Sequence, residues 1–258
     1  MNRRSLLLVA CLIAGTAVEL SPLQSAHAQA ERRECTVEER DINADCRSHV
    51  GTKNGKSPKD AANIDVTGYW ASVVTEDWRW RVVTPPKGDF ASIPLNPEGQ
   101  KVANTWDPAK AATDCKYYGA AGLLRNPLRV HLSWKDAETL LLETDHGKQT
   151  RVLNFTSAGG HREPSMQGHS VAAWEVPSLK VVTTGLLPGY LRKNGVPYSE
   201  RTVLTEYFNR YSAFGAEWLT VTTVVQDPTY LSREFITSSH FKRLANGSDW
   251  NPTACGAT

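Results

Sequence analysis

Residues 128–156 are LRVHLSWKDAETLLLETDHGKQTRVLNFT, and this stretch decides the fold class. From Val130 to Trp134, apolar residues alternate with polar ones, which is the period of a β-strand with one buried face. KDAE at 135–138 and DHGK at 145–148 supply the polar residues and the glycine of tight hairpin turns. The stretch therefore predicts three consecutive antiparallel strands.

The strand pattern continues on both sides of this stretch, because short runs of β-branched and aromatic residues dominate from Asp65 onward. The predicted strands are Val66–Thr75, Trp78–Thr84, Leu128–Lys135, Thr139–Thr144, Thr150–Thr156, Ser170–Glu175, Leu179–Thr184, Thr202–Arg210, Trp218–Gln226 and Phe235–Phe241. A short helix is expected from Pro97 to about Trp106. So many strands without long helices between them predict an all-β fold, either an antiparallel barrel or a β-sandwich.

The N-terminus has the three parts of a secretory signal. Arg3 and Arg4 precede the apolar run Ser5–Val18, and a small-x-small site ends at Ala28. We therefore expect residues 1–28 to be removed during export to the periplasm or the exterior, with a second possible cleavage site after Ala30. The arginine pair leaves a twin-arginine route open beside the general one.

The composition changes once behind the signal segment. Residues 29–63 are polar and rich in charge, which predicts a loop-like arm, whereas residues 64–258 are expected to form a single β domain. No stretch there approaches the roughly 18 apolar residues of a membrane helix, so no stable span is expected. The net charge is +2 and Lys/Arg blocks are absent from the sequence, so no nucleic-acid partner is expected. The oligomeric state is left open.

The cysteines favour an oxidising compartment. Cys11 falls in the signal segment, where LVAC resembles a lipid-attachment site. The other four, an even number, predict two disulfides. Of the three possible pairings, we favour Cys35–Cys46, which closes a local loop, and Cys115–Cys255, which ties the tail to the body. The sequence lacks C-x-x-C and H-x-x-x-H spacings, so neither a metal nor another cofactor is expected.

Two sets of motifs resemble known families. Gly68-Tyr69-Trp70 opens the first predicted strand, and G-x-W in that place resembles the lipocalin signature. The second set comprises Gly168–Glu175 (G-x-S-x-x-x-W-E), Leu179–Thr183 (L-x-V-x-T), Ser199–Glu206 (S-x-x-x-x-x-x-E) and Thr223–Pro228 (T-V-x-x-D-P). In this order they resemble an uncharacterised family of exported bacterial proteins with a lipocalin-like barrel. The resemblance spans roughly residues 164–240 and implies a fold and a compartment, but no activity.

Three residues are candidates for acid–base chemistry. Glu206 lies between Leu204 and Phe208 on a predicted apolar face, where a carboxylate is costly unless it is paired. It is either a structural carboxylate that Arg or backbone N–H satisfies, or a functional group. His169 begins a strand and can titrate near neutral pH, or it can cap a loop. Asp227 precedes a proline and equally suits a turn.

Three tryptophans are candidates for lining a ligand cavity. On a strand, Trp78 and Trp80 of EDWRWR at 76–81 would share one face and the two arginines the other. Trp70 belongs to G-x-W, and the resemblance implies that it plugs the closed end of a barrel. The alternative for all three is ordinary core packing.

Three further candidates lie near predicted strand ends. Tyr190 and Arg192 belong to the segment 185–195, GLLPGYLRKNG, which either covers a barrel mouth as a lid or packs as a loop. His240 lies near the end of the last predicted strand, opposite Phe241, where it lines the site or is simply solvated.

The sequence therefore leaves three functional hypotheses. The first is an exported barrel that binds a small apolar or amphipathic molecule, with Glu206 and His169 as polar anchors. The second is a cofactor-free isomerase, dehydratase or hydrolase in which these two residues form an acid–base pair and must converge. The third is a packed structural or envelope-interaction protein, which requires an exposed apolar patch in place of a cavity.

Overall fold

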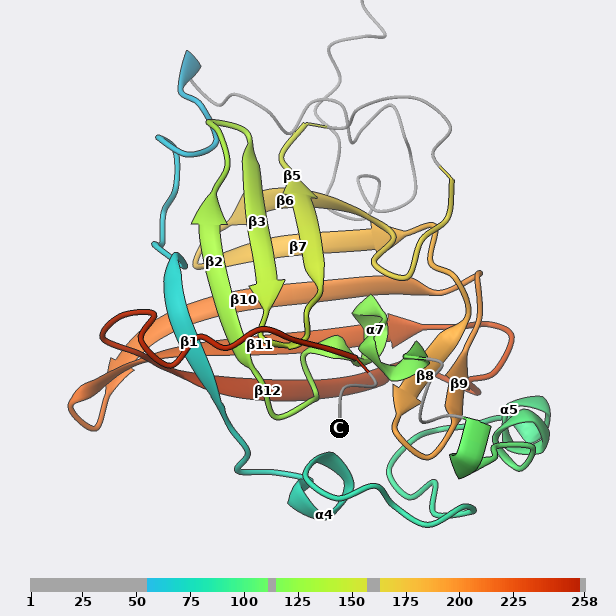
Figure 1. The fold of residues 1–258 in the computed structure, drawn as a ribbon. Coiled ribbons are helices and arrows are strands. Elements are labelled where there is room, and N and C mark those ends of the chain that lie inside the picture. Colours follow the sequence, from blue (N-terminus) through green and yellow to red (C-terminus); the bar gives the residue numbers. More distant parts are fainter. Residues whose placement is uncertain (1–54, 111–114, 157–162, 256–258) are drawn as a thin grey trace, which may run out of the picture. The chain divides into compact units, whose positions relative to one another are not determined.

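The computed structural model describes residues 55–110, 115–156 and 163–255, which contain a closed barrel of nine strands (Figure 1). The strands are β1 Gly68–Val73, β2 Arg129–Trp134, β3 Thr139–Thr144, β5 Thr150–Asn154, β6 His169–Glu175, β7 Ser178–Thr184, β10 Val203–Ala213, β11 Ala216–Gln226 and β12 Phe235–Arg243. Their order is β1-β12-β11-β10-β7-β6-β5-β3-β2, and β2 pairs again with β1. Of the two folds that the strand pattern left open, the barrel, which the lipocalin resemblance also implied, is the one found.

The barrel contains one departure from antiparallel pairing. In a ring of antiparallel neighbours the strand direction alternates, so an odd number of strands forces at least one parallel pair. That pair is β5–β6, in which Leu153 lies opposite Ser170, and the other described barrel pairs are antiparallel. Parallel neighbours need a long crossover, here residues 155–168, of which 157–162 lie outside the described residues. The antiparallel prediction is therefore right for most of the barrel.

Alternating side chains fill the interior of the barrel. Along β10, Leu204, Glu206 and Phe208 are buried and their neighbours in the strand are half-buried. The same alternation in the other strands, with some residues of the adjoining segments, builds the larger of the buried apolar clusters described, whose members are Val66, Trp70, Leu123, Leu124, Leu128, Val130, Leu132, Leu140, Leu142, Leu153, Phe155, Ala172, Leu179, Val181, Phe208, Leu219, Val221 and Phe241. Burial of these side chains is the main favourable contribution to folding.

The G-x-W tripeptide has a specific structural role at the start of β1. Trp70 is fully buried, and its indole N–H donates to the carbonyl of Val66 at 3.0 Å. The guanidinium of Arg243 lies over the Trp70 ring, 5.4 Å from the centroid. Gly68 has a φ of 111°, and a Cβ there would lie 3.1 Å from Nη2 of Arg243. The backbone conformation therefore favours glycine at this position, and a side chain there would also have to displace the Arg243 guanidinium slightly.

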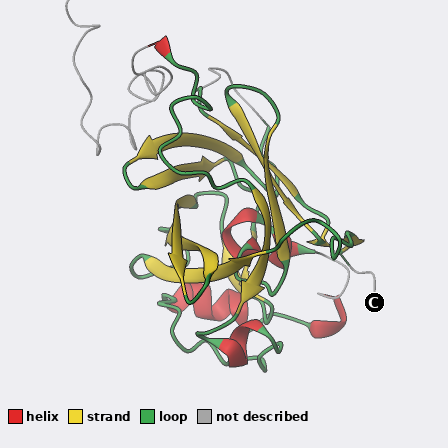
Figure 2. Cartoon of the chain, turned by 90° about the vertical axis from the view of Figure 1, so that its left-hand side faces the viewer, coloured by secondary structure: helices red, strands yellow, loops and turns green. Residues whose placement is uncertain are grey.

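The helical segments gather mostly at one end of the strands (Figure 2). They are α4 Trp78–Arg81, α5 Pro97–Ala103, η2 Lys116–Tyr118 and α7 Ala120–Leu123. The helix expected from Pro97 is confirmed, and the side chain of Asn96 caps it by accepting from Gly99 N at 2.8 Å. Within the described residues, no helix is long and apolar enough to cross a membrane.

The strand predicted over Trp78–Thr84 is wrong, because the chain turns there into the one-turn helix α4. Asp77 has a φ of 53°, which breaks the extended conformation before Trp78. The side chain of Arg81 points into the protein, and its Nε donates to the carbonyl of Arg125 at 2.9 Å. Tertiary contacts of a buried arginine thus override the alternating pattern WRWR.

Two small paired segments lie outside the barrel sheet. β8 Gly189–Arg192 and β9 Val196–Tyr198 form a hairpin, and β4 His146–Gly147 pairs in parallel with β13 Thr253–Ala254. Beside β13, the Cys115–Cys255 disulfide joins Cα atoms that lie 5.8 Å apart. This confirms one of the two predicted disulfides. Cys35 and Cys46 lie outside the described residues, as do residues 1–28 and most of the predicted arm.

Candidate ligand site at the barrel mouth

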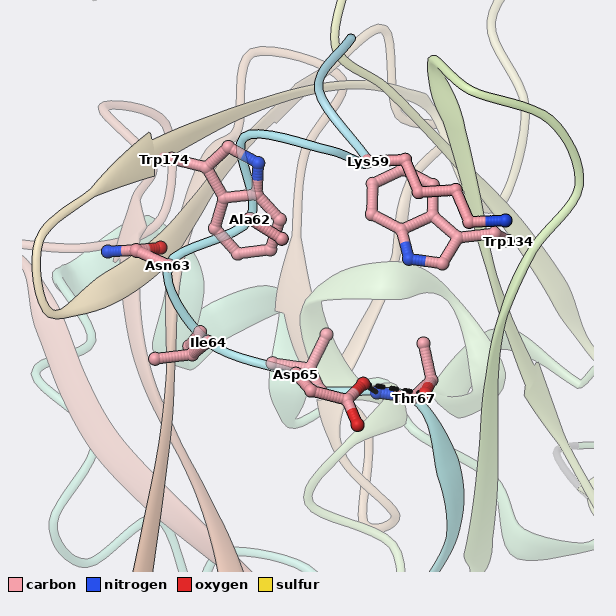
Figure 3. Close-up of a pocket in the computed structure, with 9 residues that line it drawn as sticks. Lys59, Ala62, Asn63, Ile64, Asp65, Thr67, Trp134 and Trp174 are labelled. Carbon is pink, nitrogen blue, oxygen red and sulfur yellow. Dashed lines mark hydrogen bonds between the residues drawn. The ribbon is translucent and has the colours of Figure 1, made fainter. Parts of the chain in front are cut away.

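A pocket of ≈ 360 Å³ lies at the end of the barrel where β2 ends and β1 begins (Figure 3). The chain segment 59–67, which leads into β1, begins beside the indoles of Trp134 and Trp174 and continues to the other side of the pocket, where Asp65 and Thr67 lie. Small-molecule sites typically occupy about 300–1,000 Å³ and are mostly apolar with a few polar groups. The pocket therefore has a suitable size for a small ligand.

An aromatic cluster forms the apolar wall of the pocket. Trp134 is the last residue of β2 and Trp174 the last but one of β6, so each continues the inward-facing row of its strand to the barrel mouth. Their ring centroids are 6.4 Å apart, and the buried ring of Phe155 lies 5.4 Å from Trp134 and 5.3 Å from Trp174. Because both indoles are only half-buried, they offer apolar surface that a ligand can cover.

The chain from Pro58 to Thr67 is fastened across the mouth by hydrogen bonds. Its polar contacts include the Trp174 indole N–H, which donates to the carbonyl of Pro58 at 2.7 Å, and Lys59 N, which donates to Ala137 O at 3.1 Å. Arg210 on β10 donates to the carbonyl of Asp65 at 3.0 Å. These contacts join the segment to three different parts of the barrel and give the pocket a defined second wall.

Two charged groups of opposite sign accompany the aromatic wall: the ammonium of Lys59 and the carboxylate of Asp65. Partial burial by itself raises the pKa of Asp65. The hydroxyl and the amide of Thr67 donate to its carboxylate at 2.6 and 3.0 Å, and the positive charges of Arg210 and Arg243 also stabilise the ionised form. Together these interactions outweigh the effect of burial and lower the pKa of Asp65 below its usual value. Asp65 is therefore ionised at neutral pH and gives the pocket floor a polar end.

Glu206 is a buried partner of an arginine in the barrel interior. Arg151 donates to its two carboxylate oxygens at 3.0 and 2.6 Å, and to the hydroxyl of Thr183 at 3.1 Å. The side chains of Arg151 and Glu206 are 0% and 1% exposed. The two-pronged contact neutralises both charges where water is excluded. This pairing agrees with the first alternative for Glu206, a structural carboxylate that an arginine satisfies.

His169 and Asp227 do not join Glu206. His169 lies on the outer face of β6, since its neighbour Ser170 points inward, and its Nε2 is 3.0 Å from the carbonyl of Glu163. Asp227 accepts hydrogen bonds from Ser199, Thr202, Thr229 and Tyr230 and organises the turn after β11. The structure thus places the three candidate acid–base residues in three different surroundings.

The six candidate ligand residues also fail to share one cavity. Trp70 belongs to the core, and Trp78 is 65% exposed on α4. The Arg192 guanidinium lies over the Trp80 ring at 5.1 Å, in a small pocket beyond the other end of β2.

The remaining two candidates, Tyr190 and His240, lie apart from these residues and from each other. The ring of Tyr190 on β8 lies 5.6 Å from the ammonium of Lys116. His240 faces outward on β12, where its Nδ1 lies 3.0 Å from the hydroxyl of Thr220 and its Nε2 lies 3.7 Å from the carboxylate of Glu76. His240 therefore lies on the outer face of the barrel and does not line the mouth pocket.

Trp134 and Trp174 were not among the candidates, although the sequence holds a signal for them. Val130, Leu132 and Trp134 share one face, and the turn KDAE follows directly. An aromatic residue at the last inward position of a barrel strand has to lie at the mouth. That position, more than the number of tryptophans, distinguishes it from a core tryptophan such as Trp70.

No family model matches the chain, and comparisons with curated proteins and with solved structures gave no match either.

Proposed function

We propose that this barrel binds a small apolar or amphipathic molecule at its mouth, against Trp134 and Trp174, in an extracytoplasmic compartment. The observation that carries the proposal is the ≈ 360 Å³ pocket with an aromatic wall and a charged floor. The apolar part of the ligand covers the half-buried indoles, and its polar end lies towards Asp65 on the other side of the pocket. Apolar contact supplies affinity, and the few polar groups orient the ligand.

The packed interior supports the mouth as the binding place. Leucine, valine and phenylalanine side chains fill the barrel around Trp70, and the polar pair Arg151–Glu206 is satisfied internally. A ligand deep in the barrel would have to displace these side chains, and close-packed interiors resist such changes. A ligand at the mouth leaves them in place.

The extracytoplasmic part of the proposal has two supports. Disulfides persist in oxidising compartments, and Cys115 and Cys255 form one here. Residues 1–28 have the pattern of a secretory signal, although they lie outside the described residues.

A fluorescence titration with N-phenyl-1-naphthylamine tests the binding site. This probe is uncharged and brightens in apolar surroundings, so it reports the aromatic wall and not a general attraction of charge. We expect saturable binding to the wild type. Trp134→Ala should weaken it about tenfold or more, because it loses the apolar area that the indole buries as well as about 1 kcal/mol of aromatic contact, and about 1.4 kcal/mol suffices for tenfold.

Two matched variants separate the site from general effects. Trp78→Ala removes an indole that is 65% exposed on α4 and should leave the affinity unchanged. Trp174→Phe keeps a ring in the wall but removes the donor to Pro58 O, so it should weaken binding less than Trp174→Ala. Equal affinity in the wild type and in Trp134→Ala would refute the mouth as the binding site.

A further inference from the structure

A second pocket lies beyond the opposite end of β2, between α4, α7 and β8. Trp134 ends β2 at the mouth, whereas Arg125, which lines this pocket, precedes the first residue of the strand. The lining residues are Trp80, Arg81, Tyr117, Gly122, Arg125, Asn126, Leu191, Arg192 and Lys193. Four of them carry a positive charge, and none of these described lining residues is acidic. This concentration of one sign is unusual for a buried place.

The arginines are deeply buried, which makes their charge costly. Arg81, Arg125 and Arg192 are 2%, 7% and 4% exposed. Burial lowers the pKa of Arg81 and of Arg192 to about 10, and the positive charge of Arg125 adds to this in both cases. Burial also lowers the pKa of Lys193. The protein thus places cations where their charged forms are disfavoured unless an anion compensates them.

The described carboxylates compensate part of this charge. Arg81 pairs with Glu76, and Arg125 pairs with Asp77 at 2.9 Å. The side chains of these two acids are 31% and 28% exposed, and neither lines the pocket. Both ion pairs therefore lie on the side of the guanidinium groups that faces away from the pocket.

One buried donor has no hydrogen-bond partner, and a second buried cation is bonded to neutral acceptors. Nη2 of Arg81 is buried, and it has no hydrogen-bond partner among the described residues. Arg192 donates to neutral acceptors, namely the carbonyls of Asp89 and Ala91 at 3.3 and 2.9 Å and the hydroxyl of Ser92 at 3.1 Å. These bonds pair its two terminal nitrogens with neutral oxygens, and the nearby carboxylates of Asp77 and Asp89 compensate only part of its charge, because its pKa remains lowered. A buried orphan donor in a native protein calls for a partner such as an ion or water.

We infer that this pocket is a binding site for a small anion, held by Arg81, Arg125, Arg192 and Lys193. The pocket volume is ≈ 10 Å³, which is about the room of one water molecule. One oxygen of a phosphate, sulfate or carboxylate group fits such a space, and a halide, which is larger than water, needs a slight outward shift of the flexible side chains that line it. Guanidinium groups suit these anions because they are rigid forks of charged donors. The site is separate from the mouth pocket and does not rest on it.

The line width of the chloride NMR signal tests this inference. Chloride bound to a protein relaxes fast, so exchange at the site broadens the signal of the bulk ion. We expect the folded wild-type protein to give excess broadening that saturates with chloride concentration. Phosphate and acetate are then added as competitors. Displacement shows that the site accepts an oxyanion group, and absence of displacement shows that it accepts a halide alone.

Substitutions of the lining residues test whether the broadening of the chloride signal comes from this pocket. Arg81→Gln and Arg192→Gln should weaken chloride binding at least tenfold. Arg79→Gln should retain it, because Arg79 lies on the same helix, is 61% exposed in its side chain and does not line the pocket. Circular dichroism checks the fold of each variant. If a buried variant unfolds, Lys193→Gln serves instead and should weaken binding severalfold.

Two results would overturn the inference. One is wild-type broadening no larger than that of an unrelated protein of similar charge. The other is equal broadening in the wild type, in the pocket variants and in Arg79→Gln, which would indicate diffuse surface charge. As a measurement that needs no variant, crystals soaked in bromide should show an anomalous peak beside Nη2 of Arg81, and a pocket without that peak would exclude halide binding there.

Discussion

Arg151 and Glu206 show how one residue inside the barrel depends on another far along the chain. Glu206 sits between Leu204 and Phe208 in an otherwise apolar row, and Arg151 reaches it from β5. A buried ion pair adds little net stability when both partners are present, because desolvation offsets the attraction. Removing one partner is different, since it leaves a charge without compensation.

Glu206→Gln should therefore lower the free energy of unfolding by about 3–5 kcal/mol, because Arg151 stays buried with its charge unpaired. Arg151→Met should cost a similar amount. The double variant should be clearly less destabilised than the sum of the two, since it removes both charges. Urea unfolding of the four proteins measures this cycle, and strictly additive single losses would contradict the pairing.

Asp65 gives the barrel mouth a dependence on pH. Its pKa is lowered in the folded state, so its contribution to stability is present above the unfolded pKa and is lost as the pH falls through the lower folded pKa. The difference in unfolding free energy between the wild type and Asp65→Asn should thus be present at pH 6 and shrink below about pH 4. Denaturation at a series of pH values checks this, and a difference that grows in acid would have the wrong sign.

At the scale of the element, period-two alternation predicted the barrel strands because each has one face in the core. Leu204, Glu206 and Phe208 of β10 show this, since even the charged residue keeps its place in the row. The alternation of WRWR at 78–81 predicted a strand wrongly. In α4, Arg81 is buried and Trp78 is exposed, the reverse of what a strand pattern suggests. Arg81 is buried because it donates to the carbonyl of the distant Arg125, and the residues around 78–81 do not indicate that contact.

The C-terminal element should depend on its disulfide. β13 has two residues and pairs with β4, so it has little stability of its own. Cys115 and Cys255 close a loop with a sequence separation of 140. The double variant Cys115→Ser/Cys255→Ser should lose about 4 kcal/mol of unfolding free energy, chiefly through a less restricted unfolded chain. Urea unfolding under oxidising conditions measures it, and an unchanged midpoint would show that β13 is held by other contacts.

At the scale of the whole molecule, closure of the barrel determines where a ligand can bind. The sequence predicted a cavity lined by Trp70, Trp78, Trp80 and Tyr190, but strand content alone does not say which tryptophans are interior and which lie at an end. The inward row of β2 places Trp134 at the mouth only once the ring of strands is known to close. The parallel pair β5–β6 likewise follows from closure and not from any local pattern.

Export is a further prediction at this scale. If residues 1–28 are a cleaved signal, protein recovered from its native host outside the cytoplasm should begin at Gln29. N-terminal sequencing or intact mass measures this directly. A protein that retains Met1 and stays in the cytoplasm would contradict the proposed compartment.

The most direct test of ligand binding at the mouth is the indole N–H region of a proton–nitrogen NMR spectrum during titration with N-phenyl-1-naphthylamine. Assigned by single Trp→Phe variants, the signals of Trp134 and Trp174 should move progressively and saturate together. Those of Trp70, in the core, and Trp78, on exposed α4, should stay in place. Saturating shifts confined to Trp78 or Trp80, or no saturating shift at Trp134 and Trp174, would contradict a ligand site at the barrel mouth.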